Sequence, residues 1–133
     1  MLGNADRAYK YYHQLLPMVA QNTAGSWRYK AEPYVYASNI FGPESDKFGL
    51  ANVSWLSGTA AWMYIAATQY ILGVKAKWDG LEINPCLPED WDDVKITRVF
   101  RGCKYNITIK NGGKKTFIPY EDGKTEMNVV IEK

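Results

Sequence analysis

The fold of this chain is organised around Ser54–Gly73, which reads Ser-Trp-Leu-Ser-Gly-Thr-Ala-Ala-Trp-Met-Tyr-Ile-Ala-Ala-Thr-Gln-Tyr-Ile-Leu-Gly. The second part of this stretch predicts a helix, because apolar residues recur at three- and four-residue spacing. Gly73 stands where such a helix would end. The residues that would share the apolar face are Ala60, Met63, Tyr64, Ala67, Tyr70 and Ile71.

The start of this predicted helix carries Ser57-Gly58-Thr59. A hydroxyl oxygen of Ser57 or Thr59 can cap the first turn, and the missing Cβ of Gly58 lets another group approach the backbone. The first amides of a helix have no partner within it, and the helix dipole places about half a positive charge there. Two interpretations are open: an ordinary capped and buried helix, which is the commoner case, or a site for an anion such as phosphate.

Length and composition predict one globular domain with a real core. The chain has 133 residues, of which 47% are hydrophobic and 23% are charged, so it is not a disordered chain. The net charge of +2 gives no reason to expect nucleic acid or an acidic membrane as a partner. Aromatic residues reach 14%, which suits a barrel interior or a carbohydrate-handling surface, although a plain core is the commoner explanation.

The reactive side chains predict no metal centre. Cys86 and Cys103 lack metal-ligand spacing, and we expect them to be reduced and structural, with a disulfide open but not implied. The single histidine, His13, cannot hold a metal alone. We expect no leader peptide, because the N-terminal stretch is too short and too polar. We also expect no membrane span, because no apolar run is long enough to cross a bilayer.

The N-terminal part predicts a helix followed by a loop. Asn4 is a plausible N-cap for a helix over 5–16, which Pro17 would interrupt or kink before residues 18–20 extend it. Residues 21–31 are polar and predict a loop. Because the first helix begins near Met1 with no earlier element to cover it, we expect the chain to be the end of something longer.

The middle part is more ambiguous. Glu32–Ile40 allows a short helix with Pro33 in its first turn, or a strand, and we favour the helix because helices flank it. Gly42–Asn52 predicts a long loop that could wall a ligand site.

After Gly73 the pattern changes to that of strands. The turn sequences Arg101-Gly102-Cys103 and Asn111-Gly112-Gly113 both indicate hairpins. The chain is therefore predicted to be helical up to about Val74 and β from about Lys77. The predicted strands cover residues 81–83, 94–100, 104–110, 116–120 and 127–132.

Several short motifs follow one another in order: Ala31–Tyr36, Gly42-Pro43-Glu44, Ser54–Trp62, Thr68–Val74, Trp78–Pro88 and Trp91. Any one of these pieces is weak evidence, but the ordered set is specific. The set covers roughly residues 5–110 and resembles the C-terminal end of the cellobiose phosphorylase family of glycoside phosphorylases.

This resemblance implies an α+β fold, in which the last helices of an (α/α)6 barrel are followed by a small antiparallel β-domain. Residues 1–75 would be the barrel helices and residues 76–133 the β-domain. Family members run to several hundred residues, so we expect a fragment. The barrel helices should then show an apolar face without a partner in this chain, with Tyr9, Tyr12, Trp62 and Ile65 as candidates.

The resemblance also implies an activity. The family cleaves β-linked disaccharides with inorganic phosphate and inverts the anomeric carbon, which yields an α-sugar 1-phosphate and a free sugar. Phosphate is a co-substrate and no cofactor is expected. The implied location is the cytoplasm, with no nucleic acid or membrane as partner and a homodimer left open.

The resemblance transfers site residues as well. The family's phosphate site uses a Thr-Gly pair in a Trp-Leu-Thr-Gly-Thr-Ala motif, which falls on Ser57 and Gly58 here. A sugar-contacting Gln of many members falls on Ser38, and this departure leaves the sugar undetermined. The general-acid Asp and the phosphate-binding Arg and His lie upstream in the family, so no catalytic residue is expected in this segment.

The local carboxylates agree with that expectation. The acidic residues around Trp91 predict a solvated turn. Glu32 and Glu44 are better placed, with Glu32 a secondary candidate for sugar binding, although a helix cap or a loop ion pair is the commoner role for each. Trp55 and Trp62 could line a sugar site, but core packing is the commoner role. The alternative to an enzyme segment is a non-catalytic carbohydrate-binding or structural module.

Overall fold

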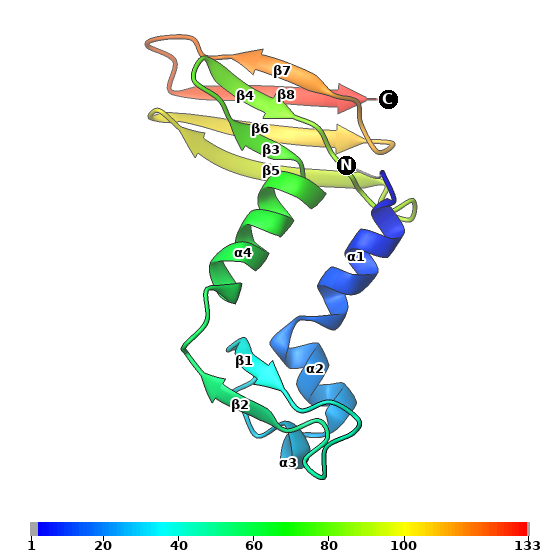
Figure 1. Cartoon of the computed structure of the whole chain (residues 1–133). Coiled ribbons are helices and arrows are strands. Elements are labelled where there is room, and N and C mark those ends of the chain that lie inside the picture. Colours follow the sequence, from blue (N-terminus) through cyan, green and yellow to red (C-terminus); the bar gives the residue numbers. More distant parts are fainter. Residues whose placement is uncertain (1–2, 133) are drawn as a thin grey trace. The chain divides into compact units, whose positions relative to one another are not determined.

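The computed structural model describes residues 3–132 (Figure 1). The chain divides into two compact units, which we describe separately. The hairpin unit comprises residues 10–65, and the β-unit comprises the described residues of 1–9 and 66–133.

The first helix begins where the sequence predicts and ends two residues before the predicted end at residue 16. Helix α1 covers Ala5–Gln14, and the Asn4 side-chain oxygen accepts a hydrogen bond from the Arg7 amide at 3.1 Å, which confirms the N-cap. Leu16 is extended, and Pro17 then occupies the first position of a separate helix α2, Pro17–Ala24. Proline therefore starts a new helix here, since its fixed φ suits the first turn.

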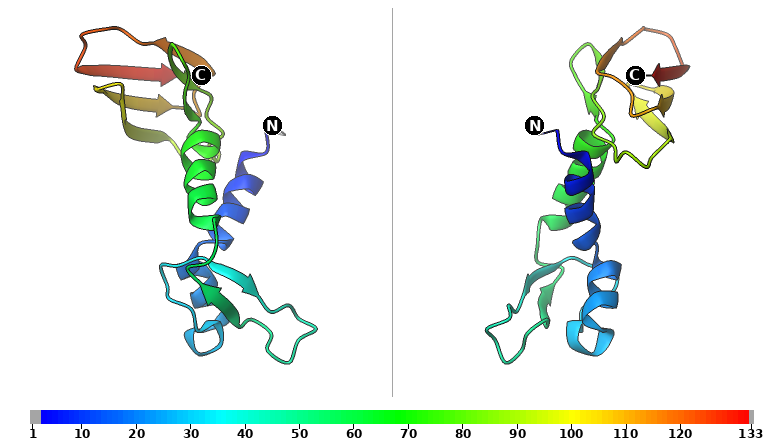
Figure 2. Two further views of the ribbon diagram at one scale, coloured as in Figure 1. Left: turned by 60° about the vertical axis from the view of Figure 1, so that its left-hand side comes forward. Right: turned by 90° about the vertical axis from the view of Figure 1, so that its right-hand side faces the viewer.

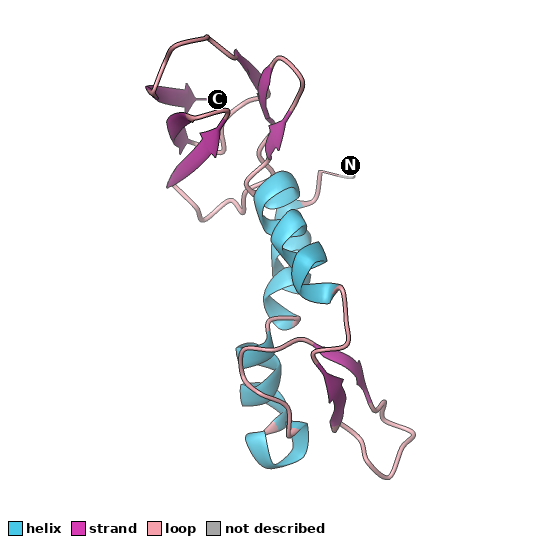
Figure 3. Cartoon of the chain, turned by 90° about the vertical axis from the view of Figure 1, so that its left-hand side faces the viewer, coloured by secondary structure: helices cyan, strands magenta, loops and turns pink. Residues whose placement is uncertain are grey.

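The rest of the hairpin unit corrects two predictions. Residues 21–31 are not a loop, because α2 continues to Ala24 and a short helix α3 covers Ser26–Tyr29. Residues 32–40 do not form a helix: turns lead into strand β1, Ala37–Ile40, which pairs antiparallel with β2, Ala51–Ser54 (Figure 3). The strand alternative was correct at β1 because residues 37–40 find a partner strand beyond a long loop, and local spacing does not reveal that partner.

The predicted central helix is confirmed, but its second half is widened. Helix α4 covers Thr59–Ile65 and continues as the π-helix η1, Ala66–Ile71. The Leu72 amide donates to the Ala67 carbonyl at 2.8 Å, an i to i+5 bond that marks the wider turn. Gly73 ends the helix at φ +76°, and a Cβ there would lie 2.2 Å from the Asn84 carbonyl oxygen, so only glycine fits.

The β-unit contains two three-stranded sheets (Figure 2). One sheet has the order β3-β4-β7, and the other has the order β5-β6-β8. The strands are β3 Val74–Ala76, β4 Gly80–Ile83, β5 Asp93–Phe100, β6 Cys103–Lys110, β7 Thr116–Pro119 and β8 Glu126–Glu132.

The core of the β-unit follows the alternation along β6. Every second residue of this strand, from Cys103 to Ile109, is at most 1% exposed. Leu81 and Ile83 of β4 are fully buried, and Ile131 of β8 is nearly so. Strand residues with period-two burial thus supply a continuous apolar interior.

The strand pairing corrects the prediction of a purely antiparallel β-domain. The β5–β6 hairpin forms as predicted, but residues 111–113 do not make a second hairpin. After β6 the chain crosses to the other sheet, where β7 pairs with β4, and β8 then returns to lie parallel to β6. Strand β3 was not predicted.

Two further sequence predictions can be checked. Cys86 and Cys103 are free thiols, which confirms that they are not paired. Among residues 3–132, no helix combines the length and the apolarity needed to cross a membrane.

Candidate functional site

The N-terminus of α4 lies open in the hairpin unit. The Gly58 carbonyl accepts the first helical hydrogen bond, from the Trp62 amide at 3.2 Å, so Gly58 itself is the cap residue. Within residues 3–132, the hydroxyls of Ser57 and Thr59 make no capping bond, and the predicted side-chain cap is wrong. The first amides of α4 are therefore available to an external acceptor.

Glycine at position 58 has no structural reason within this chain. Gly58 is not among the glycines with a positive φ, so its backbone conformation is open to other residues. A Cβ at this position would meet Trp62 at 3.7 Å, an ordinary contact distance. Neither the backbone nor the packing of the described residues requires glycine here.

The segment that leads into α4 is strained. Val53 and Trp55 have φ of +53° and +69°, values that are rare for residues other than glycine and especially for a β-branched one. Strained residues of this kind cluster at functional sites, where the surrounding structure holds them. The strain flanks Ser54 and lies directly before Ser57.

Glu32 holds this segment in place. Its carboxylate accepts a hydrogen bond from the Trp55 indole Nε1 at 3.2 Å. The pKa of Glu32 is lowered, first by its own backbone amide and then by the Ser54 hydroxyl and the Trp55 indole. Glu32 is therefore ionised at neutral pH, and its charge lies beside the strained segment.

Two aromatic rings accompany the Glu32 carboxylate. Tyr34 and Trp55 contact edge to face, with ring centroids 6.4 Å apart, and both rings are about 70% exposed, at 73% and 69%. The commoner expectation of core packing is therefore wrong for Trp55, and it is also wrong for Trp62, which is 72% exposed. An exposed ring pair beside a carboxylate is suited to a sugar, whose hydroxyls and flat faces need both.

Ser38 lies on the same end of the hairpin. Its neighbour Ala37 pairs with Ser54, so the start of β1 lies beside the end of β2. The Ser38 side chain is exposed. The hairpin thus brings Glu32, Ser38 and the residues before Ser57 to one end, whereas no hydrogen bond among the described residues joins Ser38 to Ser57.

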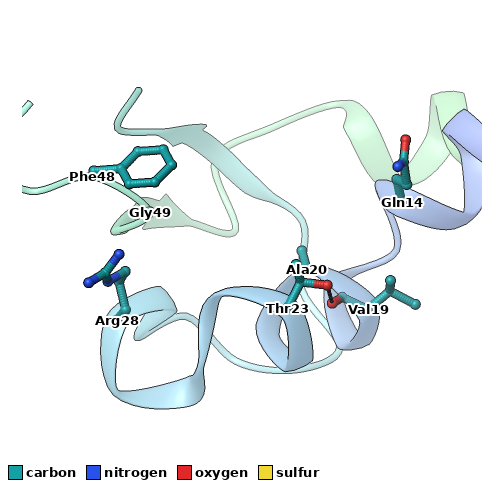
Figure 4. A pocket seen from close by; sticks show the side chains of 7 residues that line it. All are labelled: Gln14, Val19, Ala20, Thr23, Arg28, Phe48 and Gly49. Atoms are coloured by element: carbon teal, nitrogen blue, oxygen red, sulfur yellow. Dashed lines mark hydrogen bonds between the residues drawn. The ribbon is translucent and has the colours of Figure 1, made fainter. Parts of the chain in front are cut away.

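The pockets of the hairpin unit lie elsewhere. A cavity of about 420 Å³ is lined by Arg28, Thr23, Phe48 and Gly49, among others (Figure 4). Phe48 and Gly49 of the predicted long loop line this cavity, and whether the loop walls a ligand site stays a prediction. However, the loop joins Ile40 to Ala51, at the opposite end of the hairpin from Ser54.

The acidic turn around Trp91 belongs to the β-unit. The Asp6 carboxylate accepts a hydrogen bond from the Glu89 amide at 3.2 Å, and Tyr9 contacts Trp91 edge to face at 4.9 Å. This turn packs on the start of α1, and Tyr9 is not an unpartnered residue. Within residues 3–132, no group of three acidic, histidine or cysteine side chains is placed to hold a metal.

Sequence reasoning identified Ser57, Gly58, Ser38 and Glu32 but missed Tyr34. The available signal was Pro33, which favours a turn at residues 33–34, where a ring is commonly exposed.

Family comparisons cover both parts of the chain. Residues 1–73 match the family described as "Glycosyl hydrolase 94 superfamily, catalytic domain". Residues 74–132 match "Glycosyl hydrolase family 65, C-terminal domain".

Similar individual proteins are all much longer. The N,N'-diacetylchitobiose phosphorylases of Vibrio proteolyticus and Vibrio furnissii are 44% and 42% identical to this chain over 110 residues, which is 83% of the chain. The solabiose phosphorylase of Paenibacillus borealis is 37% identical over 85% of the chain. In each case this chain spans 14% of the relative's length.

Proposed function

Because this chain belongs to the glycosyl hydrolase 94 superfamily, we propose that it is the C-terminal part of an inverting glycoside phosphorylase. The complete enzyme would cleave a β-linked disaccharide with inorganic phosphate to an α-sugar 1-phosphate and a free sugar. The observation that carries this proposal is the open start of α4, where Gly58 is present without a structural need.

The chemistry of phosphorolysis explains why such a site suffices in this segment. An inverting hydrolase needs one carboxylic acid for the leaving oxygen and one carboxylate to activate water. Phosphate is already a nucleophile, so ligands that hold the anion replace the second carboxylate. Helix amides and a hydroxyl serve this purpose, because the helix dipole and the unbonded amides favour a negative charge.

In this proposal Ser57 and Gly58 bind phosphate. The Ser57 hydroxyl donates a hydrogen bond to a phosphate oxygen, and Gly58 leaves room for the anion to reach the amides of α4. The general acid is supplied upstream, so this chain alone should release no sugar 1-phosphate from a disaccharide. Residues 1–75 would contribute the last helices of the (α/α)6 barrel and residues 76–133 a separate β-domain.

The sugar would lie beside the Glu32, Tyr34 and Trp55 group. Glu32 is held ionised, so one of its oxygens can accept a hydrogen bond from a sugar hydroxyl while the other binds Trp55. Ser38 lies at the same end of the hairpin as a secondary contact. The identity of the sugar is not part of the proposal.

A chimaeric enzyme tests the proposal directly. The C-terminal segment of the Vibrio proteolyticus relative would be replaced by residues 1–133, and phosphorolysis would be measured against phosphate and disaccharide concentrations. Ser57→Ala should raise the phosphate KM about ten- to a hundredfold, since a hydrogen bond to a charged group contributes about 1.5–3 kcal/mol. The disaccharide KM should stay within about twofold, because the sugar does not use that hydroxyl.

Two further variants separate binding from folding. Gly58→Ala adds a Cβ that the chain tolerates, so it should raise the phosphate KM without changing the melting temperature by more than about 2 °C. Ser38→Ala is the matched control, which should move only the disaccharide KM. Equal shifts of both KM values in Ser57→Ala would reduce Ser57 to a structural residue, and the non-catalytic alternative would then stand for this segment.

A further inference from the structure

A group of aromatic and charged residues gathers at one end of the β-unit and includes no residue of the proposed phosphate site. The tips of the β3–β4 and β5–β6 turns meet there with the end of β7 (Figure 1). Trp78 lies in the first turn, Arg101 in the second, and Tyr120 directly follows β7. The Tyr120 amide donates to the Asp79 carbonyl at 2.8 Å, which ties the end of β7 to the Trp78 turn.

Arg101 is the centre of this group. Its guanidinium carbon lies 5.5 Å from the ring centroid of Trp78 and 5.3 Å from that of Tyr120. The same group lies 5.5 Å from the ring of Phe100, which meets Tyr120 at 89°. Arg101 also has a φ of +48°, which the two-residue turn between the paired residues Phe100 and Cys103 requires. An arginine placed by this turn among three rings is a built arrangement, since each cation–π contact helps to fix the ring orientation.

Trp78 is nevertheless almost fully accessible. Its side chain is 87% exposed, the highest value among the large apolar residues of the chain that the structure describes. Arg101 covers only part of the indole, and the rest of the ring surface faces solvent. An exposed indole beside an arginine presents a flat apolar face at low conformational-entropy cost.

Polar groups lie on the same turns and on the loop that follows Tyr120. The Tyr120 hydroxyl donates to the Asp122 carboxylate at 3.3 Å, and Asp79 and Lys77 flank Trp78 on its turn. Lys124 and Glu121 form an ion pair on the adjoining loop. A protein surface covering Trp78 would have to bury these charges, which is costly. A sugar would satisfy them, because its hydroxyls both donate and accept hydrogen bonds.

We propose that Trp78, Arg101 and Tyr120 form a carbohydrate-binding surface on the β-unit that takes a flat, β-linked sugar chain. One pyranose ring stacks on the Trp78 indole, the Arg101 guanidinium donates to ring hydroxyls, and the Asp122 carboxylate accepts from them. This surface would hold a sugar chain without reacting with it. The inference uses none of the residues of the proposed phosphate site and stands independently of it.

The test is a titration of the ¹⁵N-labelled 133-residue chain with cellohexaose, a flat β-1,4-linked chain, followed by NMR. The Trp78 indole signal and the amides of Arg101 and Tyr120 should shift together and yield one Kd. Trp78→Ala should weaken binding at least about tenfold, because it removes the stacking platform. Arg101→Lys, which keeps the charge but loses the planar fork, should weaken it about threefold.

Trp27→Ala is the matched control. Trp27 is also an exposed indole, 70% accessible, with the Arg28 guanidinium 4.8 Å from its ring, but it lies in the hairpin unit. Its loss should leave the Kd within about twofold. The proposal is overturned if millimolar cellohexaose leaves the Trp78 signal unmoved, if Trp78→Ala binds like the unmodified chain, or if Trp27→Ala weakens binding as much as Trp78→Ala does.

Discussion

The β-unit and the hairpin unit differ in where their apolar side chains lie. In the β-unit, Leu81, Ile83, Ile107 and Ile109 are at most 1% exposed and form one interior. Among the described residues, the hairpin unit buries few apolar side chains, Tyr29 and Met63 among them, and most of its large rings are exposed. The exposed set of the hairpin unit includes Trp27, Tyr34, Trp55, Trp62 and Tyr64.

This difference separates two kinds of stability. The fold of the β-unit rests mainly on its apolar interior, since burial contributes about 25 cal/mol per Å². The hairpin unit keeps its geometry through single contacts, such as the bond between Glu32 and Trp55. Exposed apolar surface of this extent is typical of a region that other protein covers, as expected for the last helices of a larger domain.

The largest expected effect tests the core of the β-unit. Ile107→Ala should lower the free energy of unfolding by about 3–4 kcal/mol, because a fully buried side chain is lost and a cavity remains. Ile40→Ala, at a position 51% exposed in β1, is the control and should cost less than about 1 kcal/mol. Urea unfolding followed by far-UV circular dichroism measures both, and equal losses would contradict the comparison.

Hydrogen exchange sharpens the comparison residue by residue. Amides in the β5–β6 ladder should exchange at least about a hundredfold more slowly than those of the β1–β2 pair, a difference of about 2.7 kcal/mol in opening free energy. The reason is that β6 is paired on both sides, by β5 and β8, whereas β1 and β2 have only each other. Similar protection in the two pairs would show that the hairpin unit is as stable as the β-unit.

Removal of two tyrosine hydroxyls should have smaller and opposite effects on stability. The Tyr105 hydroxyl is buried with no hydrogen-bond partner stronger than the Cys103 thiol among the described residues, so Tyr105→Phe should be neutral or stabilise the chain by up to about 1 kcal/mol. Burial raises the pKa of Tyr29, and a hydrogen bond with the Ala37 backbone partly offsets this rise.

Tyr29→Phe should therefore lower the free energy of unfolding by about 1 kcal/mol, because it removes this hydrogen bond. The two melting temperatures, measured side by side, should move in different directions or by clearly different amounts. A larger loss in Tyr105→Phe would reveal a partner for that hydroxyl.

The smallest effect is the response of Glu32 to acid. Its pKa is lowered in the folded chain, so its stabilising contribution is complete above the ordinary value of 4.5 and is lost as the pH falls through the lower folded value. The indole proton signal of Trp55 should therefore shift with a midpoint below pH 4.5. Glu32→Gln should remove this titration.

Glu126→Gln is the control for this titration. The pKa of Glu126 is also lowered, by hydrogen bonds from Asn106 and Lys104 in the β-unit. Its substitution should leave the Trp55 signal unchanged, and a midpoint above 4.5 in the unmodified chain would contradict the assignment.

Sequence reasoning was accurate where structure is local. The helix up to Gly73, the cap at Asn4 and the β5–β6 hairpin each rest on residues close together in the chain, and all three are confirmed. It failed where the structure of a segment depends on a pairing partner far away in the sequence. Residues 37–40 became a strand because of residues 51–54, and β7 left its sequence neighbour β6 to pair with β4.

The same division holds for the candidate site. Motifs identify which residue types stand at which positions, and they were enough to name Ser57, Gly58, Ser38 and Glu32. The exposure of Trp55 and the strain at Val53 were not predictable, because both depend on how the hairpin presents its end rather than on spacing. Whether Ser57 and Gly58 bind phosphate stays a prediction.

The route of the chain through its two sheets governs how the β-unit folds. The β5–β6 hairpin closes a short turn and can form within microseconds. Leu81 pairs with Ile118 and Lys104 with Glu126, so each sheet needs the closure of a longer segment than the hairpin turn. Since β7 and β8 follow each other but belong to different sheets, pairing of one strand brings the other strand near its own partner. The crossing thus couples the completion of the two sheets.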